Sequence, residues 1–218
     1  MLIINCKNYD EIAGDKIIRL AKVSERISKK YKIPIAISPP HHLIPLVTKF
    51  KVTILAQHLD DKKVGSTTGF MVPEIAKKSK IDGSIINHSE HRITKKEIKS
   101  LVKRLRKIKL ITVICVKNVN EAKIFAKLNP TFIAIEPPEL IGTGRAISTE
   151  RPQLITKAVD AVRSAKNSTK LLCGAGIISG NDVVRAKELG SKGILVASGI
   201  VKAKNWEKII DEFSMALV

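Results

Sequence analysis

The chain alternates between short apolar runs and stretches of helical periodicity along its whole length. Eight of the short runs are almost continuously apolar and rich in β-branched side chains. Such runs, in which apolar residues do not alternate with polar ones, are typical of parallel strands that are covered on both faces. They span Leu2–Asn5, Ile35–Ser38, Val52–Ala56, Gly83–Ile86, Leu110–Cys115, Thr131–Ile135, Lys170–Cys173 and Gly193–Val196.

Helical patterns fill most of the intervals between these runs. Thr94 with Glu97 has the spacing of a capping box, which marks the start of a helix. Ser179 with Asp182 gives a second capping signature, and Gly190 fits the end of the helix that follows. The predicted helices are Asp15–Lys29, Lys95–Lys109, Asn120–Lys127, Arg151–Ser164 and Asn181–Leu189, with a short one between His42 and Phe50.

This order of elements predicts an α/β fold. Strands that alternate with helices form a parallel sheet with right-handed crossovers. The count of eight strands favours closure into a (β/α)₈ barrel over an open doubly wound sheet, and no glycine-rich dinucleotide loop follows the first run. The 218 residues contain no linker, repeat or low-complexity segment, so we expect one barrel domain over residues 1–218.

The chain is strongly basic. It has 39 Lys and Arg against 20 Asp and Glu, a net charge of +19. Such a field attracts phosphorylated metabolites and nucleic acid alike. In the densest run, residues 95–109, apolar residues recur at helical spacing, so we interpret the lysines as a solvated outer face. Non-specific binding of nucleic acid stays open as a secondary effect, but aromatic residues are only 4% of the chain, and we expect no specific nucleic-acid partner.

The sequence gives no sign of a membrane partner, a cofactor or a metal. No apolar run approaches the roughly 18 residues of a membrane helix, and the first residues lack the features of a signal peptide. We therefore expect a cytoplasmic protein. Three widely spaced cysteines, Cys6, Cys115 and Cys173, fit neither a disulfide framework nor a metal site, and we interpret them as small buried hydrophobes.

The residues that end the predicted strands carry the chemistry, because the active site of such a barrel lies at the carboxyl ends of its strands. They include a cation, Lys7, an imidazole, His88, and a carboxylate, Glu136. A carboxylate can remove a proton α to a carbonyl, while a cation and an imidazole hold the oxyanion that develops. The turns at residues 174–176 and 197–199 open helices with small residues and can offer N–H groups to a phosphate. The set predicts proton transfer next to the carbonyl of a phosphorylated substrate.

Three motifs, in this order and at this spacing, resemble the triosephosphate isomerase family. The resemblance extends from residue 2 to about residue 204, and the chain length is similar to that of the short archaeal branch. Three positions depart from the family pattern: Cys6 replaces a bulky aromatic residue, His91 replaces a basic residue of higher pKa, and Phe70 replaces a common Glu. The motifs are Asn5-x-Lys7, Asn87-His88-Ser89-Glu90 with Arg92, and Glu136-Pro137-Pro138-x-x-Ile141-Gly142-Thr143-Gly144.

The resemblance implies an activity and a set of roles. The enzyme would interconvert D-glyceraldehyde 3-phosphate and dihydroxyacetone phosphate through an enediolate, in glycolysis and gluconeogenesis, with no cofactor. Glu136 would shuttle the proton and His88 would act as a neutral electrophile. Lys7 would neutralise charge on the substrate and the enediolate, and Asn5 would help to orient Lys7 and the carbonyl. Glu90 would pair with Lys7 without contacting the substrate.

The same resemblance implies a phosphate site, a lid and an assembly. Backbone N–H groups at Ile141–Gly142, Gly176 and Ala197–Ser198 would hold the phosphate, under a lid that runs from Pro137 to about Arg145. The chain would form a homo-oligomer, either a dimer or a tetramer. In relatives, a loop that matches Gly65–Gly69 projects into the neighbouring subunit, so Thr68 would brace the partner's site.

Two other functions remain open at this point. One is another phosphate-binding barrel enzyme, such as an isomerase or synthase of indole or thiamine precursor metabolism, which would share the phosphate turns but not the other two motifs. The other is a non-catalytic basic binding protein in which the net charge of +19 would be responsible for binding.

The net charge of +19 leads to a test by ionic strength. If the field steers an anionic substrate, kcat/KM should fall as an inert salt is raised at constant phosphate, because salt screens charges beyond about 10 Å at 0.1 M. Steady-state kinetics between about 10 and 300 mM salt measure this. A flat profile would mean that the charge has no catalytic consequence.

Overall fold

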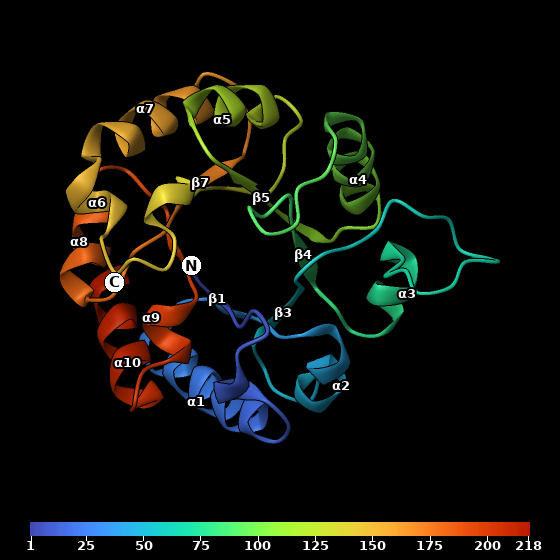
Figure 1. The fold of residues 1–218 in the computed structure, drawn as a ribbon, viewed down its shortest axis with the longest axis horizontal. Helices are drawn as coiled ribbons and strands as arrows, with labels where there is room; N and C mark the ends of the chain where they lie inside the picture. The colour runs from blue at the N-terminus through green and yellow to red at the C-terminus, as the bar shows by residue number, and fades with distance from the viewer.

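Eight parallel strands, adjacent in space in the order of the chain, close into a barrel in the computed structural model, which describes residues 1–218 (Figure 1). The predicted (β/α)₈ fold class is confirmed. The strands are β1 (Leu2–Asn5), β2 (Ile35–Ser38), β3 (Thr53–Ala56), β4 (Gly83–Ile86), β5 (Ile111–Val116), β6 (Phe132–Ile135), β7 (Lys170–Gly174) and β8 (Ile194–Val196). Each predicted strand is present, and no strand end differs from its prediction by more than one residue.

A ring of helices surrounds the barrel (Figure 1). The longer helices are α1 (Lys16–Tyr31), α4 (Lys95–Lys107), α5 (Val119–Ala126), α7 (Pro152–Arg163), α8 (Gly180–Glu188) and α10 (Trp206–Leu217). The shorter α-helices are α2 (Ile44–Val47), α3 (Pro73–Lys78), α6 (Ile147–Glu150) and α9 (Ser198–Val201). Three 3₁₀ turns complete the set: η1 (Asp10–Ile12), η2 (His41–Leu43) and η3 (Pro138–Leu140).

The helices depart from the sequence prediction in a few places. The helix expected between His42 and Phe50 is a 3₁₀ turn followed by the single turn α2. Helix α4 ends two residues before its predicted end, because Lys109 adopts a left-handed backbone with φ 57°. Helix α10 was not among the predicted helices; it packs against α1 and α8 and buries Trp206 and Phe213.

The strands bury both of their faces. Alternate residues of each strand point into the barrel and form a small inner core, while the residues between them pack against the helices in a larger outer core. This double burial explains why the strands read as continuous apolar runs. The inner core includes Ile3, Ala36, Leu55, Ile85, Val113, Phe132, Leu172 and Leu195.

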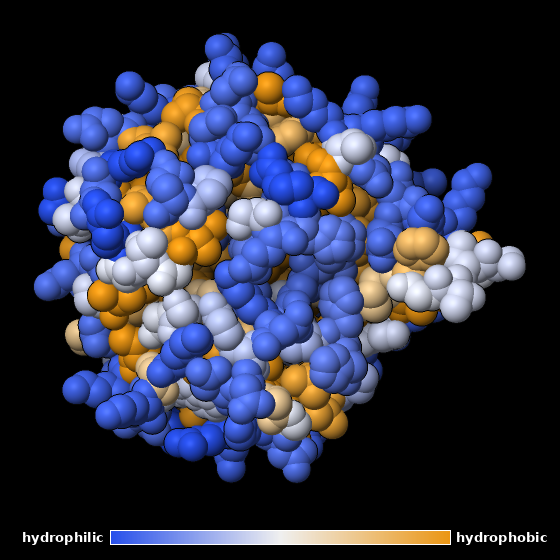
Figure 2. Space-filling view, in the orientation of Figure 1, coloured by the Kyte–Doolittle hydropathy of each residue, from blue (hydrophilic) through white to orange (hydrophobic).

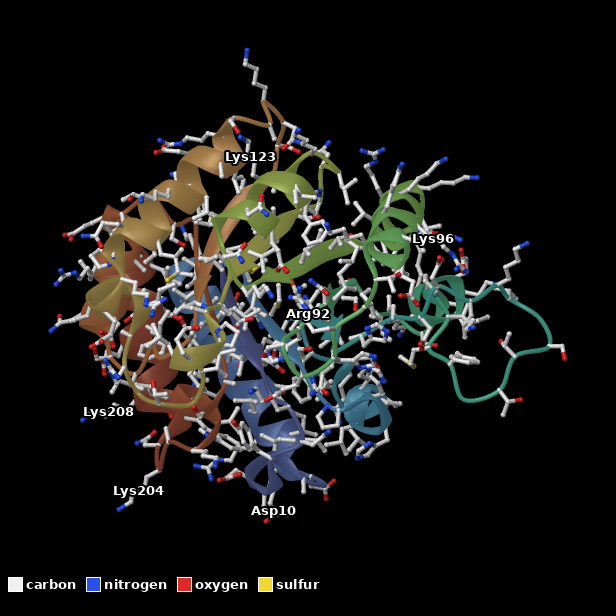
Figure 3. The ribbon with its side chains drawn as sticks, turned by 45° about the horizontal axis from the view of Figure 1, so that its top comes forward. Asp10, Arg92, Lys96, Lys123, Lys204 and Lys208 are labelled. Atoms are coloured by element: carbon white, nitrogen blue, oxygen red, sulfur yellow. The ribbon has the colours of Figure 1, made fainter.

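Helix α4 shows how the basic residues are accommodated. The backbone N–H of Glu97 donates to Thr94 Oγ1 at 3.2 Å and the N–H of Thr94 donates to Glu97 Oε2 at 2.8 Å, so the predicted capping box is confirmed. The face that includes Ile98 and Leu105 is buried. Figure 3 shows Lys96 pointing away from the barrel, as Lys123, Lys204 and Lys208 do on other elements. The interpretation of the lysines of α4 as an outer face is confirmed.

Two further features of the fold bear on function. The residues between β3 and α3 include an exposed loop, residues 61–70, that projects well beyond the ring of helices (Figure 1). The structure contains no helix that is long and apolar enough to cross a membrane.

Candidate active site

Lys7 lies two residues after the end of β1 and carries the cation of the site. Its backbone is left-handed, with φ 45°, and its N–H donates to Asn5 Oδ1 at 3.1 Å. Its ammonium donates to Glu90 Oε1 at 2.6 Å, and the side chain of Lys7 is 12% exposed. The structure therefore brings together Asn5, Lys7 and Glu90, which the sequence analysis had grouped.

His88 follows β4 and is buried, with 6% of its surface exposed. Asn87, just before it, has φ 60° and anchors the turn by donating from Nδ2 to the carbonyl of Cys115 at 2.9 Å. The backbone N–H of Glu90 donates to His88 Nδ1 at 3.2 Å. In this contact Nδ1 is the acceptor, so Nε2 is the ring nitrogen that can donate a hydrogen bond toward the cavity.

Glu136 follows β6 and faces His88, with 3.8 Å between Glu136 Oε2 and His88 Nε2. The carboxylate is buried, and its Oε2 atom has no hydrogen-bond partner. The neighbouring strand makes room for it, because a Cβ atom at Gly174 would lie 2.4 Å from Glu136 Cγ. Burying an oxygen without a hydrogen-bond partner costs free energy. This oxygen faces the imidazole of His88, so one substrate could contact both groups.

The three cysteines are buried thiols and confirm the expectation from sequence. Burial raises the pKa of Cys6 to about 12, and burial and then the charge of Glu136 raise the pKa of Cys115 and of Cys173. All three thiols are therefore protonated at neutral pH, and they are not nucleophiles.

The segment after Glu136 covers the site. It begins with the 3₁₀ turn η3, continues through Gly142 and Gly144, both with positive φ, and ends against the turn after β7. A Cβ atom at Gly176 would lie 1.9 Å from the carbonyl oxygen of Arg145, so glycine is required where the two segments meet. The segment thus rests on the β7 turn.

The turns after β7 and β8 line the same cavity with backbone groups. Ala175 and Gly176 have φ of 73° and 72°, and Ala197 and Ser198 lead into α9. The first amides of a helix have no carbonyl partner within the helix, so they are suited to an anion. The cavity brings together nine of the residues predicted from sequence: Asn5, Lys7, His88, Glu136, Ile141, Gly142, Gly176, Ala197 and Ser198.

Several residues of the cavity were missed from the sequence. Tyr9 and Ile177 also line it. Gly199, which the sequence analysis placed in the turn at residues 197–199, lines it too, and a Cβ there would lie 2.3 Å from the carbonyl of Ile177. Glu90 lines a neighbouring hollow and not this cavity, so it contacts the site through Lys7.

That neighbouring hollow contains all five histidines of the chain, and we call it the histidine hollow. The ring of His58 stacks on that of His91 with 4.0 Å between centroids, and the backbone N–H of His58 donates to His41 Nε2 at 3.3 Å. Burial, and then the adjacent His91, lower the pKa of His58 to about 4. The hollow is lined by Asn5, Lys7, Asn8, Tyr9, Pro40, His41, His42, Gln57, His58, Asp60, Gly69, Phe70, Met71, His88, Glu90 and His91.

The fold and the site together define a class: a (β/α)₈-barrel enzyme with a buried carboxylate, an imidazole and a cation at one cavity, beside the turns after β7 and β8. The comparisons with known proteins specify it further. The family model described as triosephosphate isomerase matches residues 1–213, and the chain belongs to this family. Its activity is the interconversion of D-glyceraldehyde 3-phosphate and dihydroxyacetone phosphate, a step of glycolysis.

Individual relatives agree over nearly their whole length. The chain is 54% identical over 217 residues to the triosephosphate isomerase of Cenarchaeum symbiosum, covering 100% of this chain and 97% of the relative. It is 41% identical to that of Saccharolobus solfataricus, covering 98% and 94%, and 39% identical to that of Methanocaldococcus jannaschii, covering 97% of each. These matches do not fit the two other functions that the sequence left open, which were another phosphate-binding barrel enzyme and a non-catalytic basic binding protein.

The lowered pKa of His58 predicts a stability that falls in mild acid. In the unfolded chain the pKa of His58 is near 6.5, so the unfolded chain takes up the proton before the folded protein does. The contribution of neutral His58 to the unfolding free energy is therefore fully present above pH 6.5 and is lost as the pH falls toward 4. The groups that face His58 are His91 and His41, which disfavour its charge, and Asp60 and Glu97, which favour it.

Urea unfolding at pH 7 and pH 5 measures this effect. Wild type should lose about 2 kcal/mol more unfolding free energy over this interval than His58→Gln, which has no imidazole to protonate. Equal losses in the two proteins would show that His58 is not the group responsible.

Proposed function

We propose that Glu136 is the base that carries the proton between C1 and C2 of the triose phosphate. The observation that carries this proposal is the unpartnered Glu136 Oε2, 3.8 Å from His88 Nε2 in the buried cavity. A carboxylate that no protein group satisfies can accept the substrate proton on either carbon, because it can reach both from one position. This division of roles is the one already known for the family.

His88 and Lys7 stabilise the charge that develops on the substrate oxygens. The hydrogen bond from the N–H of Glu90 to His88 Nδ1 leaves the Nε2 proton for the enediolate oxygen. Lys7 adds a full positive charge at the mouth of the cavity, held by Glu90, and Asn5 fixes the backbone of Lys7. Donors that are aligned in advance in a buried site stabilise the transition state without a cost of reorganisation.

The phosphate is held by backbone N–H groups of Ile141–Gly142, Gly176 and Ala197–Ser198, from three different segments. Support comes from their common cavity and from the helix that opens at Ser198. The segment that begins at Pro137 acts as a lid, and binding of the phosphate stabilises its closed position. Closure excludes water, and the binding energy of the remote phosphate is used at the reacting carbons.

Replacement of the base tests this mechanism. Glu136→Gln should lower kcat about 10³-fold or more with a modest change in KM, because the base acts mainly in the transition state. The matched control is Glu139→Gln in the same segment, since Glu139 is exposed and its partner is the exposed Arg151. Retention of more than a tenth of the wild-type kcat by Glu136→Gln would exclude the role, and His88→Gln should lose less activity than Glu136→Gln.

We further propose that the active form is a homo-oligomer in which the loop of residues 61–70 enters the histidine hollow of a partner subunit. Every residue of the loop is exposed, and the loop presents Val64 and Phe70, which are 57% and 46% exposed. Figure 2 shows it as a pale and orange projection beside a mostly hydrophilic surface. The hollow reaches Asn5 and Lys7, so Thr68 of the partner subunit would brace the cation, and a dimer and a tetramer both satisfy this contact.

The assembly has its own test. Replacement of Gly65–Gly69 by a shorter turn should yield smaller particles in sedimentation and lower kcat about tenfold or more, because Lys7 loses its brace while the barrel stays folded. Circular dichroism of the variant checks the fold. A fully active monomer, or an unchanged kcat in the shortened variant, would contradict the proposal.

Other expectations from the sequence stay predictions: a cytoplasmic location, the absence of a specific nucleic-acid partner, and chemistry without a cofactor. A phosphorylated triose is itself an anion, and the basic surface would attract it.

A further inference from the structure

The backbone of Lys7 is held in an unfavourable conformation at the point where the cation enters the site. A left-handed backbone is unfavourable for a residue with a side chain, and it persists only where the surroundings stabilise it. Asn5 Oδ1 accepts the N–H of Lys7, which fixes one side of the residue. The carbonyl on the other side accepts a hydrogen bond from the side chain of Gln57, Nε2 to O, at 2.8 Å.

Gln57 follows β3 directly and joins three strand ends through one amide group. Its Nε2 also donates to the carbonyl of Ser38 at the end of β2, at 3.2 Å. The same Ser38 carbonyl accepts the backbone N–H of Cys6 at 3.0 Å, the residue just before Lys7. A side-chain amide has two N–H donors. In Gln57 one of them faces the carbonyl of Lys7 and the other faces the carbonyl of Ser38.

We propose that Gln57 is a positioning residue for the catalytic cation. It holds the Lys7 peptide in its left-handed conformation, and thereby fixes the point from which the Lys7 side chain extends along the wall of the cavity to Glu90. Gln57 is not among the residues that line the active-site cavity, so it acts through Lys7 and not on the substrate. The inference rests on the role proposed for Lys7.

The side chain of Gln57 meets a narrow chemical requirement. Two carbonyl oxygens face it, so the group must donate twice and carry no negative charge. A methionine has a similar length and volume but no donor, and it would leave both carbonyls without this partner. Catalysis is sensitive to displacements well below 1 Å, so a small relaxation of the Lys7 turn should affect rate before it affects folding.

A double-mutant cycle tests the proposal. Gln57→Met should lower kcat/KM about tenfold or more in the wild-type background, and should raise the inhibition constant of inorganic phosphate, because the cation is displaced. In a Lys7→Ala background, the same substitution should change kcat/KM by less than about twofold, since the group through which it acts is gone. The matched control is Gln153→Met, which replaces the other glutamine of the chain at an exposed position.

The outcomes separate the two proposals. Equal losses from Gln57→Met in both backgrounds would show a general structural role and overturn the inference, as would wild-type kcat/KM in the single variant. If Lys7→Ala alone retained wild-type kcat/KM, the role of Lys7 itself would fail. Thermal unfolding by circular dichroism checks each protein, and Gln57→Leu is a second variant without a donor, expected to give the same cycle if Gln57→Met does not fold.

Discussion

The pairing of the first strand with the last is the constraint on which the rest of the structure depends. Strands β1 and β8 pair in parallel register, and the N–H of Ile194 donates to the carbonyl of Met1 at 3.1 Å. The contact is so close that a Cβ atom at Gly193 would lie 2.1 Å from that carbonyl oxygen. Because the ring closes here, the turn that carries Lys7 and the turn at Ala197–Ser198 line one cavity, although about 190 residues separate them.

A few residues of the closed barrel have a backbone conformation or a buried polar group that is usually unfavourable. Lys7, Asn87 and Ala175 have left-handed backbones, and Glu136 is buried with an oxygen that has no partner. All four lie at the carboxyl ends of strands, whereas the other five non-glycine residues with positive φ follow helices. Such unfavourable features persist only where the surrounding structure over-determines them, and the two-layered apolar core supplies that support.

Charge is distributed unevenly between the surface and the site. Most of the 39 basic residues lie on the outer faces of helices or in loops, and Figure 3 shows Lys96, Lys123, Lys204 and Lys208 pointing away from the barrel. Exposed ion pairs, such as that of Arg26 with Glu207, contribute little to stability. The surface therefore sets the long-range field, whereas the active-site cavity contains one nearly buried cation, Lys7.

The sequence by itself determined the fold and most of the site. Continuous apolar runs predict parallel strands, and the rule that the site lies at strand ends points to Lys7, His88 and Glu136 without any coordinates. Only the tertiary structure decided which nitrogen of His88 can donate toward the cavity, that Glu136 has an oxygen without a partner, and that Gln57 reaches the carbonyl of Lys7. The physical reason is that periodicity records which face of an element is buried, whereas a hydrogen bond between residues 50 positions apart depends on the barrel register that brings their strands together.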